Sequence, residues 1–239
     1  MNCGSQTLSM ERIVEPEWLD ELPAEDARAI RSRNDLRRIN WWMNHVGIMT
    51  KCWQKMEAGA WAHRIVELGA GDGTFLLQLA RRIAPQSHVT KAVLVDRQKL
   101  VTNETRNEFY KLGWELETVT ADVFEWLDRK GADEAAVMLT NLFLHHFPEE
   151  RLRFLLAQIS ARCRLFAACE PRRSWLALNA SRLVGLIGCN EVTRHDAVAS
   201  VRAGFVDREL SSLWPEKVSW QWEESSSGWV SHCFAACHK

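Results

Sequence analysis

The chain has 239 residues, 46% of them hydrophobic, which is enough for the core of one α/β domain with additions. Its formal net charge of −1 gives no general attraction to nucleic acid or acidic membranes, so nucleic acid is excluded as a default partner. Residues 1–10 lack a signal-peptide pattern and no run approaches the ~20 apolar residues of a membrane span, so we expect a soluble cytoplasmic protein.

Residues 1–60 are expected to form an N-terminal helical extension or lid, ahead of a main domain at 61–239. From Asp26 onward, apolar side chains recur at three- and four-residue steps, which is the pattern of an amphipathic helix or helix pair. Some polar and aromatic side chains of this extension allow two interpretations, a buried aromatic seam or a lid that covers cofactor or substrate. They include Trp41, Trp42 and His45.

The most informative stretch is 64–75, which reads R-I-V-E-L-G-A-G-D-G-T-F. A β-branched run leads into Glu67, three glycines follow at positions 69, 71 and 73, and helical spacing begins after them, so we expect a strand, a tight turn and a helix start. Glycine permits positive φ and the close approach of a ligand. The third glycine comes one residue earlier than in the dinucleotide fingerprint G-x-G-x-x-G, which argues against NAD and FAD.

After the glycine turn, helical and strand patterns alternate regularly, which predicts a parallel sheet with crossover helices. The expected helices are 74–83, 99–112, 123–130 and 149–162, and the expected strands are 89–95, 115–120, 135–140 and 165–169.

Polar residues follow the ends of these strands. In an open parallel sheet, ligands bind outside the carboxyl ends, so these side chains are expected to share one rim and form a site. They are Glu67, Asp96, Asp122, Asn141, His145, His146 and Glu170.

With an acid two residues before the first glycine, the loop resembles the E/D-x-G-x-G-x-G motif of class I S-adenosylmethionine (SAM) dependent methyltransferases. Residues 64–171 resemble the Rossmann-like core of that superfamily. Within it, the segment 144–148, L-H-H-F-P, is similar to one found in small-molecule methyltransferases of quinone, polyketide and glycoside pathways. The resemblance implies SAM contacts at Glu67, Gly69, Ala70, Gly71, Gly73, Asp96, Arg97, Asp122, Val123 and Asn141.

Two of these acids also have a purely structural interpretation. Asp96 is placed to accept hydrogen bonds from the ribose hydroxyls, but could instead cap a helix. Asp122 could accept from the adenine amino group, and an N-cap role for the following helix is the alternative.

Histidines carry the expected chemistry, because a hydroxyl acceptor must lose its proton and imidazole titrates near neutrality. Our hypothesis is that His145 is the general base, with His146 as the other candidate and Glu170 orienting the imidazole or balancing its charge. The alternative is that one or both histidines cap a helix or pack beneath the loop.

The segment after the fourth strand lacks the D/N-P-P-Y motif of amino-group methyltransferases acting on DNA. It also lacks the paired glutamates of protein arginine methyltransferases and the acidic ligands of catechol-type enzymes, so we expect a metal-free site.

One candidate metal cluster lies in the tail, H-C-x-x-x-C-H at 232–238. Side chains alternate along a strand, so its two cysteines and two histidines would face opposite ways and no metal site is expected there either. The seven cysteines, mostly in apolar runs, suit a reducing compartment.

Residues 175–187 are apolar at helical spacing and are expected to form a helix. The resemblance implies that the inserted helices at about 172–214 build the acceptor pocket. Arg194-His195-Asp196 precedes an expected helix, where it could supply a second base or simply form the helix N-terminus. Arg194, His195 and Arg202 are therefore candidate substrate residues.

The pattern of the tail, 218–223 and 229–236, predicts a hairpin around 225–228. By resemblance, this hairpin completes a mostly parallel, seven-stranded, three-layer Rossmann-like α/β fold.

Two functions remain open. The first is SAM-dependent methyl transfer to a small molecule, most simply the hydroxyl of an aromatic or polyketide-like compound of secondary metabolism. Twelve tryptophans suit a planar acceptor, although they equally suit helix packing, and carbon or nitrogen acceptors also fit. The second is a non-catalytic SAM-fold protein that binds a ligand or partner. The oligomeric state stays open, a homodimer included.

Overall fold

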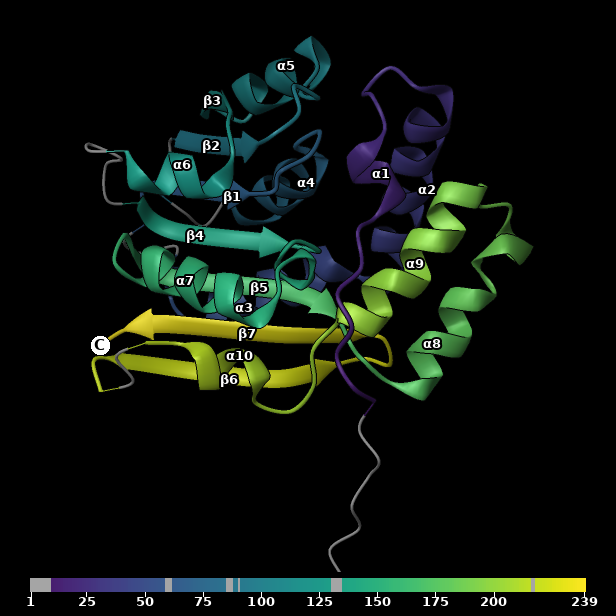
Figure 1. Ribbon diagram of the computed structural model, residues 1–239. Helices are drawn as coiled ribbons and strands as arrows, with labels where there is room; N and C mark the ends of the chain where they lie inside the picture. The colour runs from purple at the N-terminus through teal and green to yellow at the C-terminus, as the bar shows by residue number, and fades with distance from the viewer. Residues whose placement is uncertain (1–9, 59–61, 85–87, 90, 130–134, 216–217) are drawn as a thin grey trace, which may run out of the picture.

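The computed structural model describes residues 10–58, 62–84, 88–89, 91–129, 135–215 and 218–239. Within this part of the chain, seven strands form one sheet in the spatial order β3-β2-β1-β4-β5-β7-β6. The first five strands run parallel, whereas β7 is antiparallel to both β5 and β6. This is the expected Rossmann-like sheet with a C-terminal hairpin (Figure 1). The strands are β1 (Arg64–Leu68), β2 (Lys91–Asp96), β3 (Glu115–Thr120), β4 (Ala135–Asn141), β5 (Cys163–Pro171), β6 (Trp220–Ser227) and β7 (Ser231–His238).

Helices cover both faces of the sheet and form the outer two layers of the sandwich. Side chains alternate along β1, so Ile65 packs with α3, α4 and α5 while Val66 packs with α6, α7 and α10. The helices are α1 (Trp18–Glu21), α2 (Ala27–Met43), α3 (His45–Lys55), α4 (Thr74–Ile83), α5 (Asn103–Lys111), α6 (Val123–Asp128), η3 (Leu144–His146), α7 (Glu149–Ser160), α8 (Trp175–Arg182), η4 (Val184–Ile187), α9 (Glu191–Ala203) and α10 (Glu209–Leu213).

A helical cap stands beyond the ends of the parallel strands. Figure 1 shows α1, α2, α8 and α9 on the side to which the arrows of β4 and β5 point. The third helix of the expected N-terminal extension behaves differently: α3 packs Trp53 into the same apolar cluster as Ile65 of β1. The extension is therefore partly cap and partly a component of the sheet's own core.

Several expected boundaries shift, each for a local reason. The helix expected from residue 99 begins at Asn103, because the Thr102 hydroxyl accepts a hydrogen bond from the Thr105 amide and caps it there. The long helix expected through 187 ends at Arg182 and continues as the 3-10 turn η4. The expected end of the third crossover helix, at residues 130–131, lies outside the described residues.

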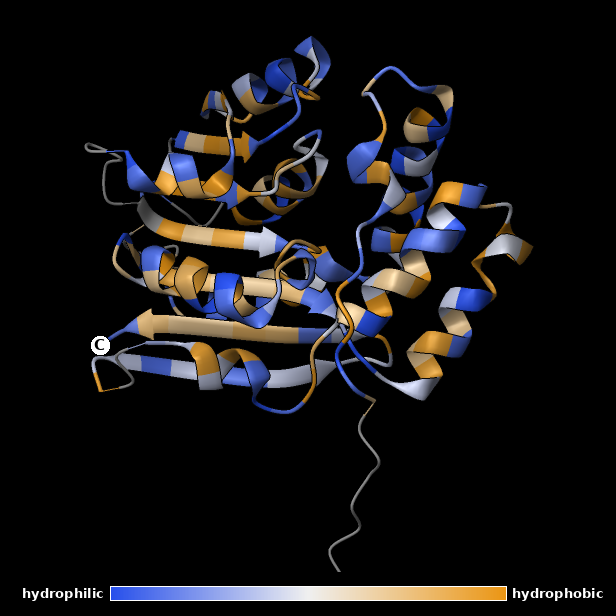
Figure 2. Cartoon of the chain, viewed as in Figure 1, coloured by the Kyte–Doolittle hydropathy of each residue, from blue (hydrophilic) through white to orange (hydrophobic). Residues whose placement is uncertain are grey.

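The hairpin places a polar strand at the sheet edge. Figure 2 shows apolar residues concentrated along β4, β5 and β7, whereas β6 is more polar. Charged and polar side chains on an edge strand disfavour pairing with other chains. In the described part of the chain, no helix has the length and apolar character that crossing a membrane requires.

Trp214 tests the packing of the face that carries α10. Its buried ring stacks on Phe166 with centroids 5.5 Å apart and meets the edge of Trp220 at 5.1 Å. Trp214→Ala should lower the free energy of unfolding by about 3–5 kcal/mol, because the cavity cannot close fully. Trp229→Ala, whose side chain is 77% exposed, should change it by less than about 0.5 kcal/mol in the same denaturant titration. Equal effects of the two substitutions would contradict this packing.

Candidate functional site

A cavity of about 660 Å³ opens at the carboxyl ends of the parallel strands. Its volume lies in the range typical of small-molecule sites. Most of the expected cofactor residues and both candidate catalytic histidines line it, whereas Gly73 and Glu170 stand behind the lining. The residues brought together are Glu67, Gly69, Ala70, Gly71, Asp96, Arg97, Asp122, Val123, Asn141, His145 and His146.

Glycine at 71 suits the backbone conformation of the loop and leaves the space beside it open to a ligand. Gly71 has φ of 55°, a left-handed conformation that other residues rarely adopt. No protein atom lies within 4 Å of the place where its Cβ would stand, so any side chain would project into free space beside the cavity. The backbone of this loop can therefore approach a ligand closely.

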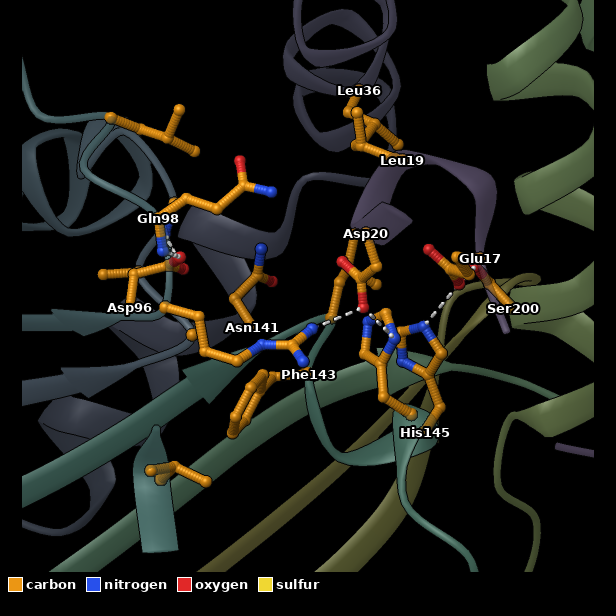
Figure 3. Close-up of a pocket in the computed structure, with 18 of the residues that line it drawn as sticks. Glu17, Leu19, Asp20, Leu36, Asp96, Gln98, Asn141, Phe143, His145 and Ser200 are labelled. Atoms are coloured by element: carbon orange, nitrogen blue, oxygen red, sulfur yellow. Dashed lines mark hydrogen bonds and ion pairs between the residues drawn. The ribbon is translucent and has the colours of Figure 1, made fainter. Parts of the chain in front are cut away.

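Asp96 at the end of β2 is bonded to the glycine loop. Its Oδ2 accepts from the Gly71 amide at 2.8 Å and its Oδ1 accepts from the Gln98 amide at 2.8 Å (Figure 3). Burial raises the pKa of Asp96 although these two amides oppose the shift. Two carboxylate oxygens have more acceptor capacity than two amides fill, so Asp96 can also accept from the hydroxyls of a ribose.

Asp122 performs the structural role left open by the sequence. Its Oδ1 accepts from the Phe124 amide at 2.8 Å and caps α6. The residue also lines the cavity, so the cap does not exclude a contact with adenine, which stays a prediction.

Glu67 is 1% exposed, and its Oε2 has no hydrogen-bond partner in the described part of the chain. Burial, followed by the charge of Asp72, raises its pKa well above the ordinary value. An orphaned buried carboxylate beside a cavity is suited to a ligand that donates hydrogen bonds or carries positive charge. The amino group of SAM has both properties, so this residue fits the expected cofactor.

Asn141 is held by a residue that we expected in the substrate site. His45 is fully buried, with Nδ1 2.7 Å from Oδ1 of Asn141 and Nε2 2.9 Å from the Ser231 hydroxyl. Burial lowers the pKa of His45 to about 4, so it is neutral. His45 therefore supports Asn141 from behind and does not line the cavity.

Glu170 organises the loop that carries the two histidines. Its Oε1 accepts from the amides of Phe143 at 3.1 Å and Leu144 at 2.9 Å, and its Oε2 lies 2.7 Å from Nδ1 of His145. The Glu170 side chain is fully buried, so these hydrogen bonds replace the ones that its carboxylate would make with water. The carboxylate fixes both the loop and the orientation of the His145 ring.

His145 is enclosed between two carboxylates. Its Nε2 lies 3.2 Å from Oε1 of Glu17, which comes from the N-terminal strap, residues 10–21 (Figure 3). Burial alone would lower the pKa of His145, but hydrogen bonds and charges from Glu17 and Glu170 outweigh it and raise the pKa to about 9. Burial likewise would raise the pKa of Glu17, but His145 and its neighbours lower it to about 2. His145 is thus an imidazolium with no free lone pair at neutral pH, which argues against our hypothesis that it is the base.

His146 has a different environment. Its side chain is 21% exposed and lines the cavity, with Nδ1 3.5 Å from Oδ2 of Asp20. Within the part of the chain that the structure describes, no side chain is hydrogen-bonded to its Nε2. It is the histidine of the pair that a substrate can reach.

The remaining predicted substrate residues lie away from the cavity. Trp41 and Trp42 are 74% and 61% exposed, which overturns the buried aromatic seam, and neither lines the cavity as a lid would. Among the residues that the structure describes, no tryptophan lines the cavity, and the phenylalanines that do are Phe75, Phe143 and Phe147.

The Arg194-His195-Asp196 triplet lies inside α9 rather than before a helix. Asp196 accepts from the amides of Trp18 at 2.9 Å and Leu19 at 3.0 Å, and the His195 ring stacks on Trp18 with centroids 4.0 Å apart. These residues anchor the strap. Arg194 is exposed, and Arg202 lies near Glu15. Neither they nor His195 line the cavity, so the cavity wall gives no support to their predicted substrate role.

Sequence reasoning expected a lid from residues 1–60 but missed the side chains of the strap and α2 that line the cavity. They include Glu17, Leu19, Asp20, Arg33, Leu36, Arg37 and Asn40. A signal did exist in α2: Arg33, Arg37 and Asn40 recur at four and three residues, which places them on one helical face. The strap has no such periodicity.

Glu17, His145 and His146 also bring three metal-ligand atoms within 4.8 Å of one another. The Nε2 of His145 already faces a carboxylate, so a metal would have to displace a bound proton. The expectation of a metal-free site stays a prediction. In the tail, His232 bonds Glu224 at 2.8 Å while Sγ of Cys233 lies 3.5 Å from that of Cys169, so these neighbours engage different partners.

Residues 65–164 match the family model described as a methyltransferase domain. No curated protein matches the chain. An O-methyltransferase family protein from Burkholderia thailandensis shares the fold at a TM-score of 0.60, with 17% identity over 90% of this chain and 61% of that one. The mitomycin 7-O-methyltransferase gives a TM-score of 0.59, with 15% identity over 92% of this chain and 60% of that one.

A magnesium protoporphyrin IX methyltransferase from Synechocystis PCC 6803, solved with bound S-adenosylhomocysteine (SAH), gives a TM-score of 0.52. It is 11% identical over 92% of this chain and 91% of that one. At these identities the likeness establishes the fold alone, a Rossmann-like fold that these methyltransferases share. The chain spans less than two thirds of the length of the Burkholderia and mitomycin enzymes.

The two carboxylates beside His145, from Glu17 and Glu170, predict an unusual titration of its imidazole. Its imidazole ¹⁵N shifts should change near pH 9 rather than near the ordinary 6.5, and Glu17→Gln should move the midpoint down because one carboxylate charge is lost. A raised pKa stabilises the fold fully below about pH 6.5, and this contribution is lost as pH rises through 9. A titration midpoint of His145 near the ordinary 6.5 in the wild-type protein would contradict the effect of the two carboxylates.

Proposed function

We propose, from the premise that residues 65–164 form a methyltransferase domain of the class I fold, that this protein transfers a methyl group from SAM to a small-molecule acceptor. The observation that carries the proposal is the convergence on one cavity of the glycine loop, the orphaned Glu67, and the acids at the ends of β2 and β3. These groups suit the amino group, the ribose and the adenine of one ligand.

The cofactor, when bound, supplies an electrophilic methyl group on a sulfonium. The chain's own task is to hold an acceptor in line with that methyl group and to remove the proton of a hydroxyl acceptor. We propose that this acceptor is a hydroxyl of an aromatic or polyketide-like metabolite. Phe143 and Phe147 in the cavity wall, rather than the tryptophans, support a planar apolar acceptor.

His146 is the better candidate for the proton acceptor. It lines the cavity, and Asp20, with Oδ2 3.5 Å from Nδ1, can balance the charge of the ring once it takes up a proton. His145 supports it as a positioning residue: its ring lies 4.3 Å from that of His146, measured between centroids, and its bonds to Glu17 and Glu170 fix the loop.

Ligand binding tests the proposal directly. Wild-type protein should bind SAH in calorimetry, and Gly71→Arg should lose this binding because its side chain extends into the cavity. Gly113→Arg is a matched control, since Gly113 has φ of 77°, an equally open Cβ position and no place in the cavity wall. Phenolic and polyketide acceptors are then screened by mass spectrometry. A methylated product should be about 14 mass units heavier than its acceptor, because a methyl group replaces a hydrogen atom. Absence of SAH binding by wild-type protein would support the non-catalytic alternative.

The role of His146 is tested once an acceptor is found. His146→Gln should lower kcat by about 10²- to 10⁴-fold while leaving SAH affinity nearly unchanged, because only proton removal is lost. His63→Gln, at an exposed position outside the cavity, is the control and should keep the wild-type rate.

Each assay is repeated after dialysis against EDTA, which should leave the rate unchanged if transfer is metal-free. A wild-type rate for His146→Gln, or loss of activity with EDTA and its return with a divalent cation, would contradict this assignment.

A further inference from the structure

Two cysteines outside the cavity wall meet between neighbouring strands of the sheet. Cys169, near the end of β5, is fully buried, and Cys233 of β7 is partly exposed. The two strands are antiparallel neighbours (Figure 1), and their register places Cys169 directly opposite Cys233. Their Sγ atoms are 3.5 Å apart, and both thiols are free. The sheet therefore holds two reduced sulfur atoms in contact.

The backbone geometry of this pair already suits a disulfide. Directly opposed residues of antiparallel strands have Cα atoms about 4.5–5.5 Å apart, within the range of about 4.4–6.8 Å that disulfides span. A bond requires the two sulfur atoms to approach from 3.5 Å to about 2.05 Å, which rotation of the two side chains can supply. The strands β5 and β7 therefore need not separate or slide for the thiols to join.

The neighbouring thiols are less well placed. Cys237 follows Cys233 by four residues and lies on the same face of β7, but it is opposite Leu165 of β5. Cys52 of α3 packs against the same apolar cluster, and burial raises its pKa to about 12. Of these four cysteines, Cys169 and Cys233 are the two that the strand register pairs.

The different burial of the two thiols determines the order in which they react. A thiolate is the form of cysteine that attacks an oxidant. Burial raises the pKa of Cys169 well above its ordinary value, and the neighbouring Cys233 and Glu170 shift this pKa in the same direction. Cys233 is the more accessible thiol of the pair, so an oxidant meets Cys233 first and Cys169 then attacks the product.

We propose that Cys169 and Cys233 form a redox modification site, at which hydrogen peroxide converts the two thiols to a disulfide. The Cys233 thiolate attacks one peroxide oxygen, so that an S–O bond forms and the O–O bond breaks. This leaves a sulfenic acid on Cys233 and releases hydroxide, which takes up the proton that Cys233 lost.

The second step joins the two residues. The Cys169 sulfur attacks the Cys233 sulfur, the S–S bond forms, the S–O bond breaks, and water leaves with the proton of Cys169. Together the two thiols lose two electrons, and hydrogen peroxide is reduced to water. A dithiol reductant reverses the modification by thiol–disulfide exchange.

The disulfide fixes the strand end that supports the histidine loop. The Cys169 carbonyl accepts from the Leu142 amide at 2.9 Å, and the next residue is Glu170, whose carboxylate lies against His145. A bond from Cys169 to Cys233 ties this support covalently to β7. Because the two cysteines are far apart in sequence, the bond also restricts the unfolded chain and stabilises the fold.

Oxidation followed by peptide mapping tests the site. Wild-type protein is treated with a small excess of hydrogen peroxide, the remaining thiols are blocked with iodoacetamide, and a digest is analysed by mass spectrometry. We expect a peptide pair joined through Cys169 and Cys233, which dithiothreitol separates. Before blocking, the oxidised chain should be about 2 mass units lighter, because two hydrogen atoms are lost. It should also melt about 5–15 °C higher than the reduced protein.

Three variants identify the reacting pair. Cys233→Ser and Cys169→Ala should each abolish the cross-link and the rise in melting temperature. Cys237→Ser is the matched control, since Cys237 is partly exposed on the same strand and face, and this variant should retain both effects. Thermal unfolding of each reduced variant shows whether it is folded before oxidation.

Three results would overturn the proposal. They are cross-links through Cys52 or Cys237, a sulfinic acid on Cys233 with no cross-link, and an oxidised protein that melts no higher than the reduced one. The oxidation is measured without cofactor or acceptor, so its outcome is independent of the proposed methyl transfer.

Discussion

The hydrogen bonds that link Glu17 to His145 and His145 to Glu170 are the constraint on which the shape of the cavity depends. It joins the N-terminal strap, the loop after β4 and the end of β5, three segments that are far apart in sequence. Each charge alone would be costly to bury, and together they satisfy one another. The strap is held over the site by this ionic contact and by the Asp196 carboxylate, which binds the amides of Trp18 and Leu19.

This constraint assigns different work to two adjacent histidines. His145 is protonated between Glu17 and Glu170 and fixes the loop, whereas the side chain of His146 lines the cavity. The same loop leads back through Asn141 to His45, a neutral imidazole buried against Ser231. The chemistry proposed for the site therefore depends on buried polar networks that specify geometry more than they add stability.

The fold was largely predictable because hydrophobic period and glycine position are local signals. The parallel strands, the hairpin and the cofactor loop follow from them, and Asp96 follows from its place at a strand end. An N-terminal lid was expected, but the residues of the strap and α2 that line the cavity were not predicted, because they depend on how distant segments pack. Trp41, Trp42 and His195 show the same limit, since residue type suggested a site while packing left the tryptophans exposed and stacked His195 on Trp18. The state of His145 required knowing that Glu17 lies beside it.

The central claim is that the cavity at the carboxyl ends of the parallel strands holds SAM, with its nucleoside at the ends of β2 and β3. A crystal structure of the protein soaked with SAH measures this directly. The account predicts the ribose within hydrogen-bond distance of Asp96 and the adenine beside Asp122. Density for SAH in the reverse orientation, or outside this cavity, would contradict it.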